Sequence, residues 1–180
     1  GGGEGRCDEV GCGWGGAVGG ETARRRGAKA AEHGITLALH APYDIAWSGV
    51  EPEKREASIG YLLAWARALD WMGGSRVILH SGSCGKMSRE QALSLACETL
   101  ARARAALDEA GYAHIVLCPE TMGKINQLGT LEEVLTLCEL DERMLPCIDF
   151  GHLNARTLGA VRTQEDYAAI LDAVEQRLGT

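Results

Sequence analysis

The residues best suited to chemistry lie where short apolar runs end. His40 and His80 each close one such run, Glu120 and Asp149 close two more, and His152 follows Asp149 by three residues. Imidazole and carboxylate groups together are typical ligands of Zn, Mn or Fe. A single histidine at the end of a run would more often be structural, whereas four such run ends in succession predict a metal site.

The spacing of these residues is regular. His80 follows His40 by 40 residues, and Glu120 follows His80 by the same interval. Each interval has room for one strand and one helix. In parallel βα folds the carboxyl ends of the strands meet at one edge, where ligands bind. We therefore expect the four side chains to surround one mouth, with His152 close enough to reach it from a loop.

The segments between these residues alternate in their pattern. Strands are expected at 35–39, 76–79, 114–117 and 145–148. Helices are expected at 21–33, 52–72, 89–110, 130–139 and 164–178, with Thr22, Ser88 and Thr163 as N-caps. Short strands that alternate with longer helices indicate βα units and a parallel sheet.

Composition limits the class of protein. The chain has 180 residues, 46% hydrophobic and 24% charged, which predicts one globular domain rather than a disordered polymer. A net charge of −7 argues against loose nucleic-acid binding through bulk charge. The apolar runs are all well short of the ~20 residues of a membrane span, so no membrane partner is expected. Seven scattered cysteines without a CxxC pair indicate a reducing, cytoplasmic location.

Glycine divides the chain into two regions. Residues 1–20 hold ten of the 24 glycines. Such a segment has little to bury and loses much entropy when it is ordered. We therefore expect residues 1–20 to be disordered or degraded, without a first strand, and residues 21–180 to form the domain.

Four motifs, in order, carry a resemblance to a known family. His40–Tyr43 matches an HxPY element, His80–Ser83 an HPGS element, Glu120–Gly123 an ENTAG element and Asp149–His152 a DTxH element. Over residues 30–178 the sequence resembles endonuclease IV. This is a family of zinc-dependent apurinic/apyrimidinic endonucleases within the xylose isomerase-like TIM-barrel superfamily.

The resemblance implies a fold and a partner. The fold is a partial (β/α)8 TIM barrel of about four to five consecutive βα units. The chain is expected to be truncated at both ends, because further ligands of the family would lie beyond Thr180 and the first strand is expected to be missing. The partner is DNA with abasic sites, cut 5′ to the abasic sugar, with activity impaired in a fragment. Asp44 stands where DNA-cutting members carry an apolar residue.

The resemblance also implies roles for individual residues. His40, His80 and Glu120 would hold a first zinc. Glu120, the catalytic residue, would bridge to a second zinc that Asp149 also holds, and His152 would hold a third. Tyr43 would contact the substrate. A complete member of the family carries up to three Zn²⁺, and one is expected for this chain.

Two other functions are compatible with the same residues. A sugar isomerase or epimerase of the superfamily would use one Mn²⁺ or Mg²⁺ held by Glu120 and Asp149, although the three histidines favour the endonuclease type. A non-catalytic, truncated module is the third alternative, and open sheet edges would allow it to self-associate. Metal content separates the three, since they predict three zinc ions in a complete protein, one Mn²⁺ or Mg²⁺, or none.

Overall fold

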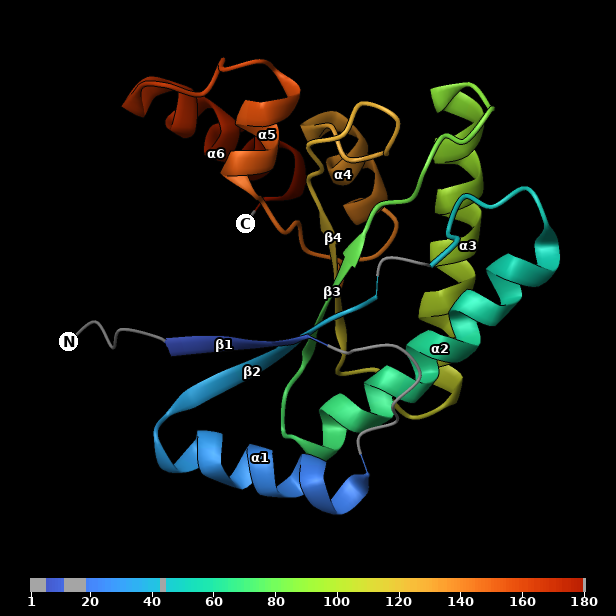
Figure 1. Ribbon diagram of the computed structural model, residues 1–180, viewed down its shortest axis with the longest axis vertical. Coiled ribbons are helices and arrows are strands. Elements are labelled where there is room, and N and C mark those ends of the chain that lie inside the picture. The colour runs from blue at the N-terminus through green and yellow to red at the C-terminus, as the bar shows by residue number, and fades with distance from the viewer. Residues whose placement is uncertain (1–5, 12–18, 43–44, 180) are drawn as a thin grey trace.

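A computed structural model describes residues 6–11, 19–42 and 45–179. Four parallel strands form one sheet in the order β1-β2-β3-β4 (Figure 1). Their bounds are Arg6–Gly11 for β1, Ile35–His40 for β2, Arg76–His80 for β3 and Val116–Glu120 for β4. The α/β fold with a parallel sheet, predicted from the alternation of patterns, is confirmed.

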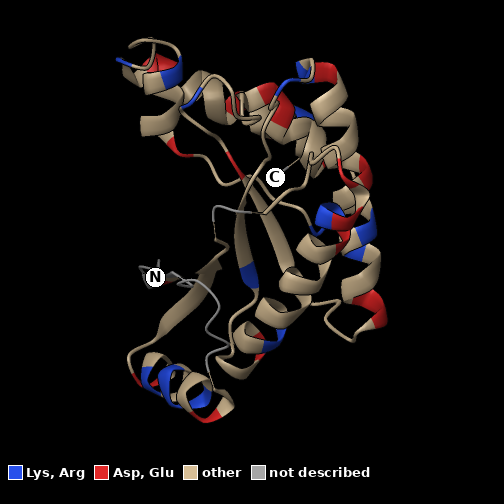
Figure 2. Cartoon of the chain, turned by 45° about the vertical axis from the view of Figure 1, so that its right-hand side comes forward, with Lys and Arg blue, Asp and Glu red and all other residues tan. Residues whose placement is uncertain are grey.

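Helices follow the strands and form an arc around the sheet (Figure 1). Their bounds are Gly20–Glu32 for α1, Pro52–Trp71 for α2, Arg89–Glu109 for α3, Leu131–Cys138 for α4, Phe150–Arg156 for α5 and Gln164–Leu178 for α6. Figure 2 shows that the charged residues belong mostly to the helices and loops. Among the residues that the structure describes, no helix is both long and apolar enough to cross a membrane.

Side-chain alternation along the strands separates the core from the site. Leu39, Val77 and Leu117 are in register on three neighbouring strands, are fully buried, and share one hydrophobic cluster with residues of α2 and α3. Burying such a side chain stabilises the fold by about 1.5–3 kcal/mol. Because successive side chains on a strand point to opposite faces, His40 and Ile78 point away from that cluster.

Two helices begin at the predicted N-caps Ser88 and Thr163, and a third begins just after Thr130, where a predicted helix starts. Each of these three side chains accepts a hydrogen bond from the backbone N–H three residues on, and the side chain of that later residue accepts one from the backbone N–H of the N-cap, which completes a capping box. In contrast, α1 begins at Gly20 with Gly19 as its N-cap, so the prediction of Thr22 as an N-cap is wrong.

The expectation that the first strand is missing is wrong. β1 lies inside the glycine-rich segment and pairs in parallel with β2 from Arg6 with Ile35 to Gly11 with His40. Pairing with β2 supplies backbone hydrogen bonds that the composition of residues 1–20 does not reveal. The other residues of that segment, apart from 19 and 20, lie outside the described residues, as do Tyr43 and Asp44.

The predicted strand at 145–148 forms only in part. Its backbone runs parallel to β4, with isolated bridges from Met144 to Leu117 and from Cys147 to Glu120. The N–H groups of Leu145 and Cys147 donate to β4 carbonyls. On β4 and just after it, the N–H groups of Leu117 and Thr121 donate in return, but Pro119 between them has no N–H to donate, which is one reason why the ladder stays irregular. The residues after the predicted strand form helix α5, which the sequence analysis treats as a loop.

Candidate metal centre

His40, His80 and Glu120 meet at the carboxyl-terminal edge of the sheet. Nε2 of His40 lies 3.2 Å from Oε2 of Glu120, and Nε2 of His80 lies 3.6 Å from the same oxygen. The two imidazole rings are nearly perpendicular, with centroids 5.2 Å apart. One ligand atom from each of the three residues lies within 4.8 Å of the others. We call this set the first group.

The register of the strands explains this meeting. His80 pairs directly with Glu120, whereas His40 pairs with Ile78, two residues before His80. Such a stagger between neighbouring strands is typical of a sheet that curves into a barrel. This register brings His80 and Glu120 to the same level along their strands. It leaves His40 lower, where its side chain reaches across to Glu120.

The hydrogen bonds of His40 select the nitrogen that can bind a metal. Its Nδ1 lies 2.8 Å from the carbonyl oxygen of Ala41. Since a carbonyl can only accept, Nδ1 carries the proton and donates. Nε2 then faces the carboxylate of Glu120. This arrangement is the one by which proteins orient a metal-binding histidine, with one ring nitrogen held by a backbone carbonyl and the other directed at the ion.

The pKa values of His40 and His80 are shifted in opposite directions. The hydrogen bond that Nε2 of protonated His40 donates to the Glu120 carboxylate, opposed by burial, raises the pKa of His40. Burial lowers the pKa of His80, and the opposing charge of Glu120 does not compensate for it. At neutral pH His80 is therefore neutral, which is the form that binds a metal.

A second group shares Glu120. It consists of Glu120, Asp149 and His152, whose ligand atoms also lie within 4.8 Å of one another. Nδ1 of His152 is 3.3 Å from Oε1 of Glu120 and 3.4 Å from Oδ2 of Asp149. Glu120 thus presents Oε2 to the first group and Oε1 to the second, so a single carboxylate could bridge two ions.

Helix α5 and the residue after Glu120 place the second group. Asp149 is the N-cap of α5, and its Oδ1 accepts a hydrogen bond of 2.7 Å from the backbone N–H of His152. The hydroxyl of Thr121 accepts a hydrogen bond of 2.8 Å from the backbone N–H of Asp149. The role of Thr121 was not predicted. Asp149 is a residue type that often serves as an N-cap, with its side chain bonded to a backbone N–H two or three residues on, and it could have indicated helix α5.

The structure places Nδ1 of His152 beside Glu120 and Asp149. That nitrogen also lies 2.9 Å from the carbonyl oxygen of Thr121. The third zinc that the resemblance gives to His152 stays a prediction.

The donor set fits a divalent ion such as zinc. The first group offers two imidazole nitrogens and a carboxylate, which is the ligand set of an open Zn site. The second group offers two carboxylates and an imidazole. Glu120 is nearly buried, and a buried carboxylate requires a paired charge or a metal. Tyr43, predicted to contact the substrate, lies outside the described residues.

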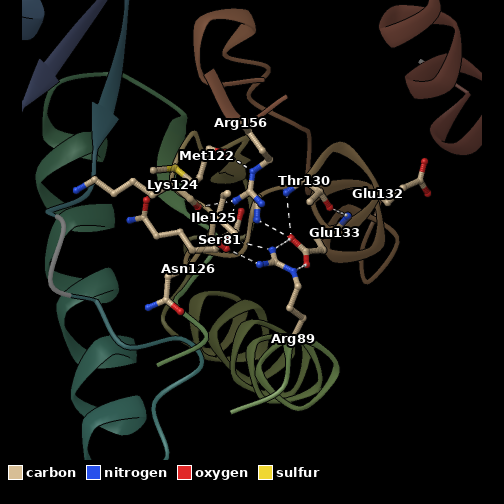
Figure 3. A network of polar contacts seen from close by, with 12 residues as sticks. Ser81, Arg89, Met122, Lys124, Ile125, Asn126, Thr130, Glu132, Glu133 and Arg156 are labelled. Atoms are coloured by element: carbon tan, nitrogen blue, oxygen red, sulfur yellow. Dashed lines mark hydrogen bonds and ion pairs between the residues drawn. The ribbon is translucent and has the colours of Figure 1, made fainter. Parts of the chain in front are cut away.

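An exposed positive charge lies close to this site. Lys124 belongs to the loop after β4, next to Gly123, where a Cβ would lie 3.4 Å from Cδ2 of His152. Its charge makes the smallest of the named contributions to the lowered pKa of His80, after burial, Glu120 and the charges of His40 and His152. The Lys124 side chain extends away from the guanidinium groups of Arg89 and Arg156 (Figure 3).

The fold, parallel strands with helices around them, is that of the TIM-barrel class. At consecutive strand ends it carries imidazole and carboxylate groups that could hold a metal ion. A sequence model of the xylose isomerase-like TIM barrel family matches residues 9–180. The chain belongs to that family, and the resemblance stated from its four motifs is confirmed at this level.

Curated relatives include an uncharacterized protein and several endonucleases. The chain is 35% identical to the uncharacterized protein, from Methanocaldococcus jannaschii, over 145 residues, which are 81% of this chain and 52% of the relative. It is 28% identical to a probable endonuclease 4 of Mycoplasma pneumoniae over 148 residues, which are 79% of this chain and 49% of the relative. The chain therefore spans about half the length of these relatives.

Solved structures with the same fold include enzymes of two kinds. A D-tagatose 3-epimerase-like protein superposes with a TM-score of 0.74 at 16% identity, over 95% of this chain and 63% of that one. Endonuclease IV from Thermus thermophilus superposes with a TM-score of 0.62 at 23% identity, over 97% of this chain and 72% of that one. At these identities the likeness establishes the fold alone.

Proposed function

We propose that this chain carries the zinc centre of an endonuclease IV-like phosphodiesterase that acts at abasic sites in DNA. One observation carries the proposal, namely that Glu120 divides its two oxygens between two groups of metal ligands. Ions held by these two groups would supply Lewis-acid chemistry, which activates water and stabilises charge on the oxygens of a phosphodiester. The probable endonuclease 4 relatives support the same chemistry.

The residues of the chain have distinct tasks in this proposal. Glu120 holds the two groups at a fixed separation. The carbonyl of Ala41 keeps Nε2 of His40 turned toward Glu120, where an ion would bind. Lys124 supplies a positive charge beside the site, which favours a phosphate-bearing substrate. DNA binding then depends on local charge and not on the net charge of −7.

The test compares abasic and intact DNA. The purified chain, loaded with zinc, is titrated with a duplex that contains one abasic analogue and with the same duplex undamaged. We expect tighter binding to the abasic duplex that requires zinc, and slow nicking 5′ to the abasic sugar. E120Q should remove both. Equal affinity for the two duplexes with and without zinc would contradict the proposal.

A sugar epimerase or isomerase is the second candidate. The epimerase-like structures support it, since several superpose on this chain, and Glu120 with Asp149 would hold its single Mn²⁺ or Mg²⁺. The same preparation decides between the two functions. Interconversion of keto sugars with one Mn²⁺ per chain would favour the epimerase, whereas two or more bound zinc ions without sugar turnover favour the endonuclease.

A further inference from the structure

Helix α5 carries two ligands but has little packing of its own. It is seven residues long, and Leu153 is the one residue within it that is buried. A helix this short is marginal in water without tertiary contacts. Asp149 and His152, whose side chains are each 39% exposed, are not held by a surrounding core. Thr121 bonds the backbone of Asp149 and the ring of His152 and so fixes the start of α5 beside Glu120, but these bonds do not hold its last turn.

Arg156, in the last turn of α5, holds this end of the helix. Its Nε donates to the carbonyl oxygen of Met122 at 2.7 Å. Its Nη2 donates to the carbonyl oxygens of Lys124 at 2.7 Å and Gln127 at 2.6 Å. All three carbonyls belong to residues 121–130, which we call the site loop and which follows Glu120 directly. One side chain thus ties the helix of Asp149 and His152 to the segment that leaves Glu120.

The site loop is held from its other side by Arg89 and Glu133. Arg89, on α3, donates to the carbonyl oxygens of Ile125 and Gln127 and forms a two-point ion pair with Glu133 (Figure 3). Oε2 of Glu133 also accepts from the backbone N–H groups of Gly129 and Thr130. The site loop is therefore fixed to α3 and α4. The carbonyl groups to which Arg156 donates belong to a segment that is itself held in place.

This arrangement brings two positive groups together. Arg89 and Arg156 both donate to the carbonyl oxygen of Gln127. Burial, followed by the charge of Arg89, lowers the pKa of Arg156. Two neighbouring guanidinium groups repel each other, and the loop carbonyls together with Glu133 compensate for that repulsion. Lysine, with one compact ammonium, cannot reproduce the planar set of donors that reaches three carbonyls.

We propose that Arg156 is a positioning residue for the second group, and that it sets the distance of Asp149 and His152 from Glu120. The first group does not depend on α5, because its ligands lie on β2, β3 and β4. This inference rests on the two ligand groups of the proposed function. Loss of Arg156 should therefore weaken one metal site and leave the other unchanged.

The experiment measures zinc binding in two backgrounds. H40A leaves the second group intact, and D149N leaves the first group intact; R156Q is added to each, and zinc alone is titrated calorimetrically into the metal-free chains. In the H40A background we expect R156Q to weaken zinc binding by about 10- to 100-fold, the usual effect of losing a residue that orients a ligand. In the D149N background the affinity should stay within about twofold.

Two further variants separate positioning from general stability. R177Q removes a guanidinium that bonds Glu139 and Glu132 and joins α6 to α4, away from the site loop, so zinc binding should be unchanged. R156K should fold even if R156Q does not, and should recover part of the affinity of the second group. Equal weakening of both groups by R156Q or R156K would show a merely structural role and overturn the inference.

The same titration tests the proposed function separately. If H40A binds zinc as tightly with R156Q as without it, the inference about Arg156 fails while the two-group site stands. If the unmodified chain binds only one ion, the two-group site itself is wrong, and the inference falls with it. Hydrogen exchange at residues 121–130 gives a second readout, since R156Q should speed exchange there in the metal-free chain.

Discussion

At the scale of single residues, Glu120 is the one ligand that belongs to both groups among the described residues. It is nearly buried, and three histidine side chains face its two oxygens within 3.6 Å. E120Q preserves the shape of the side chain but removes its charge and one acceptor. We expect E120Q to weaken both zinc sites by more than the 10- to 100-fold typical of an orienting residue.

A matched histidine variant checks this expectation. H40A should weaken the first site alone, because His40 does not belong to the second group. Calorimetric zinc titrations of E120Q and H40A, with the total zinc per chain measured by atomic absorption, give the comparison. A Glu120 variant that still binds two ions would show that the carboxylate is not shared.

Lys124 allows a prediction about substrate charge. If this side chain contacts a phosphate, K124Q should weaken binding to an abasic duplex and reduce the slope of log K against log salt by about 0.9. K29Q is the control, since Lys29 lies on α1 in an ion pair with Glu32. Fluorescence anisotropy at several salt concentrations measures both variants. An unchanged slope for K124Q would mean that Lys124 does not contact DNA.

At the scale of elements, strands β2 to β4 and the capped helices could be predicted, whereas β1 and α5 could not. Ser88, Thr130 and Thr163 indicate helix starts because capping is local in sequence. β1 depends on pairing with β2, which composition does not report. The five predicted metal ligands come together at one edge, whereas Arg156 could not be foreseen, because its partners are loop carbonyls without a sequence signal.

The start of α4 makes a pH-dependent contribution to stability. Burial raises the pKa of Glu133, but its bonds with Arg89 and with two backbone N–H groups outweigh this, so the net pKa is lowered. A carboxyl whose pKa is lower in the folded chain stabilises the fold above its unfolded pKa of about 4.3. That contribution is lost as the pH falls through the lower, folded value.

E133Q should remove this contribution. We expect E133Q to reduce the free energy of unfolding by about 2 kcal/mol at pH 7, because Glu133 makes a charged pair at a nearly buried position. The difference from the unmodified chain should shrink below about pH 4. Urea unfolding between pH 3 and pH 7 measures it. E139Q, which breaks an exposed pair with Arg177, should change stability much less than E133Q does. A pH-independent difference for E133Q would contradict this account.

At the scale of the whole molecule, the site lies at the edge of a sheet of four strands. The family model matches residues 9–180, yet the chain spans about half of the curated relatives. A (β/α)8 barrel typically takes about 250 residues and closes around its mouth. Within residues 6–11, 19–42 and 45–179, the ligand residues come from β2, β3, β4 and the start of α5. A closed barrel would surround these ligands on every side.

This geometry predicts that the 180-residue chain binds zinc more readily than it cuts DNA. The first group has a complete set of three protein ligands, as in an open zinc site. Cleavage also requires the scissile phosphate to be held within a fraction of an ångström, and a displacement of about 1 Å can reduce the rate about 100-fold. We therefore expect nicking of an abasic duplex at least about 100-fold slower than by endonuclease IV from Thermus thermophilus, assayed in parallel with excess zinc. A comparable rate would show that these four strands, alone or with a second copy of the chain, are sufficient to hold the phosphate.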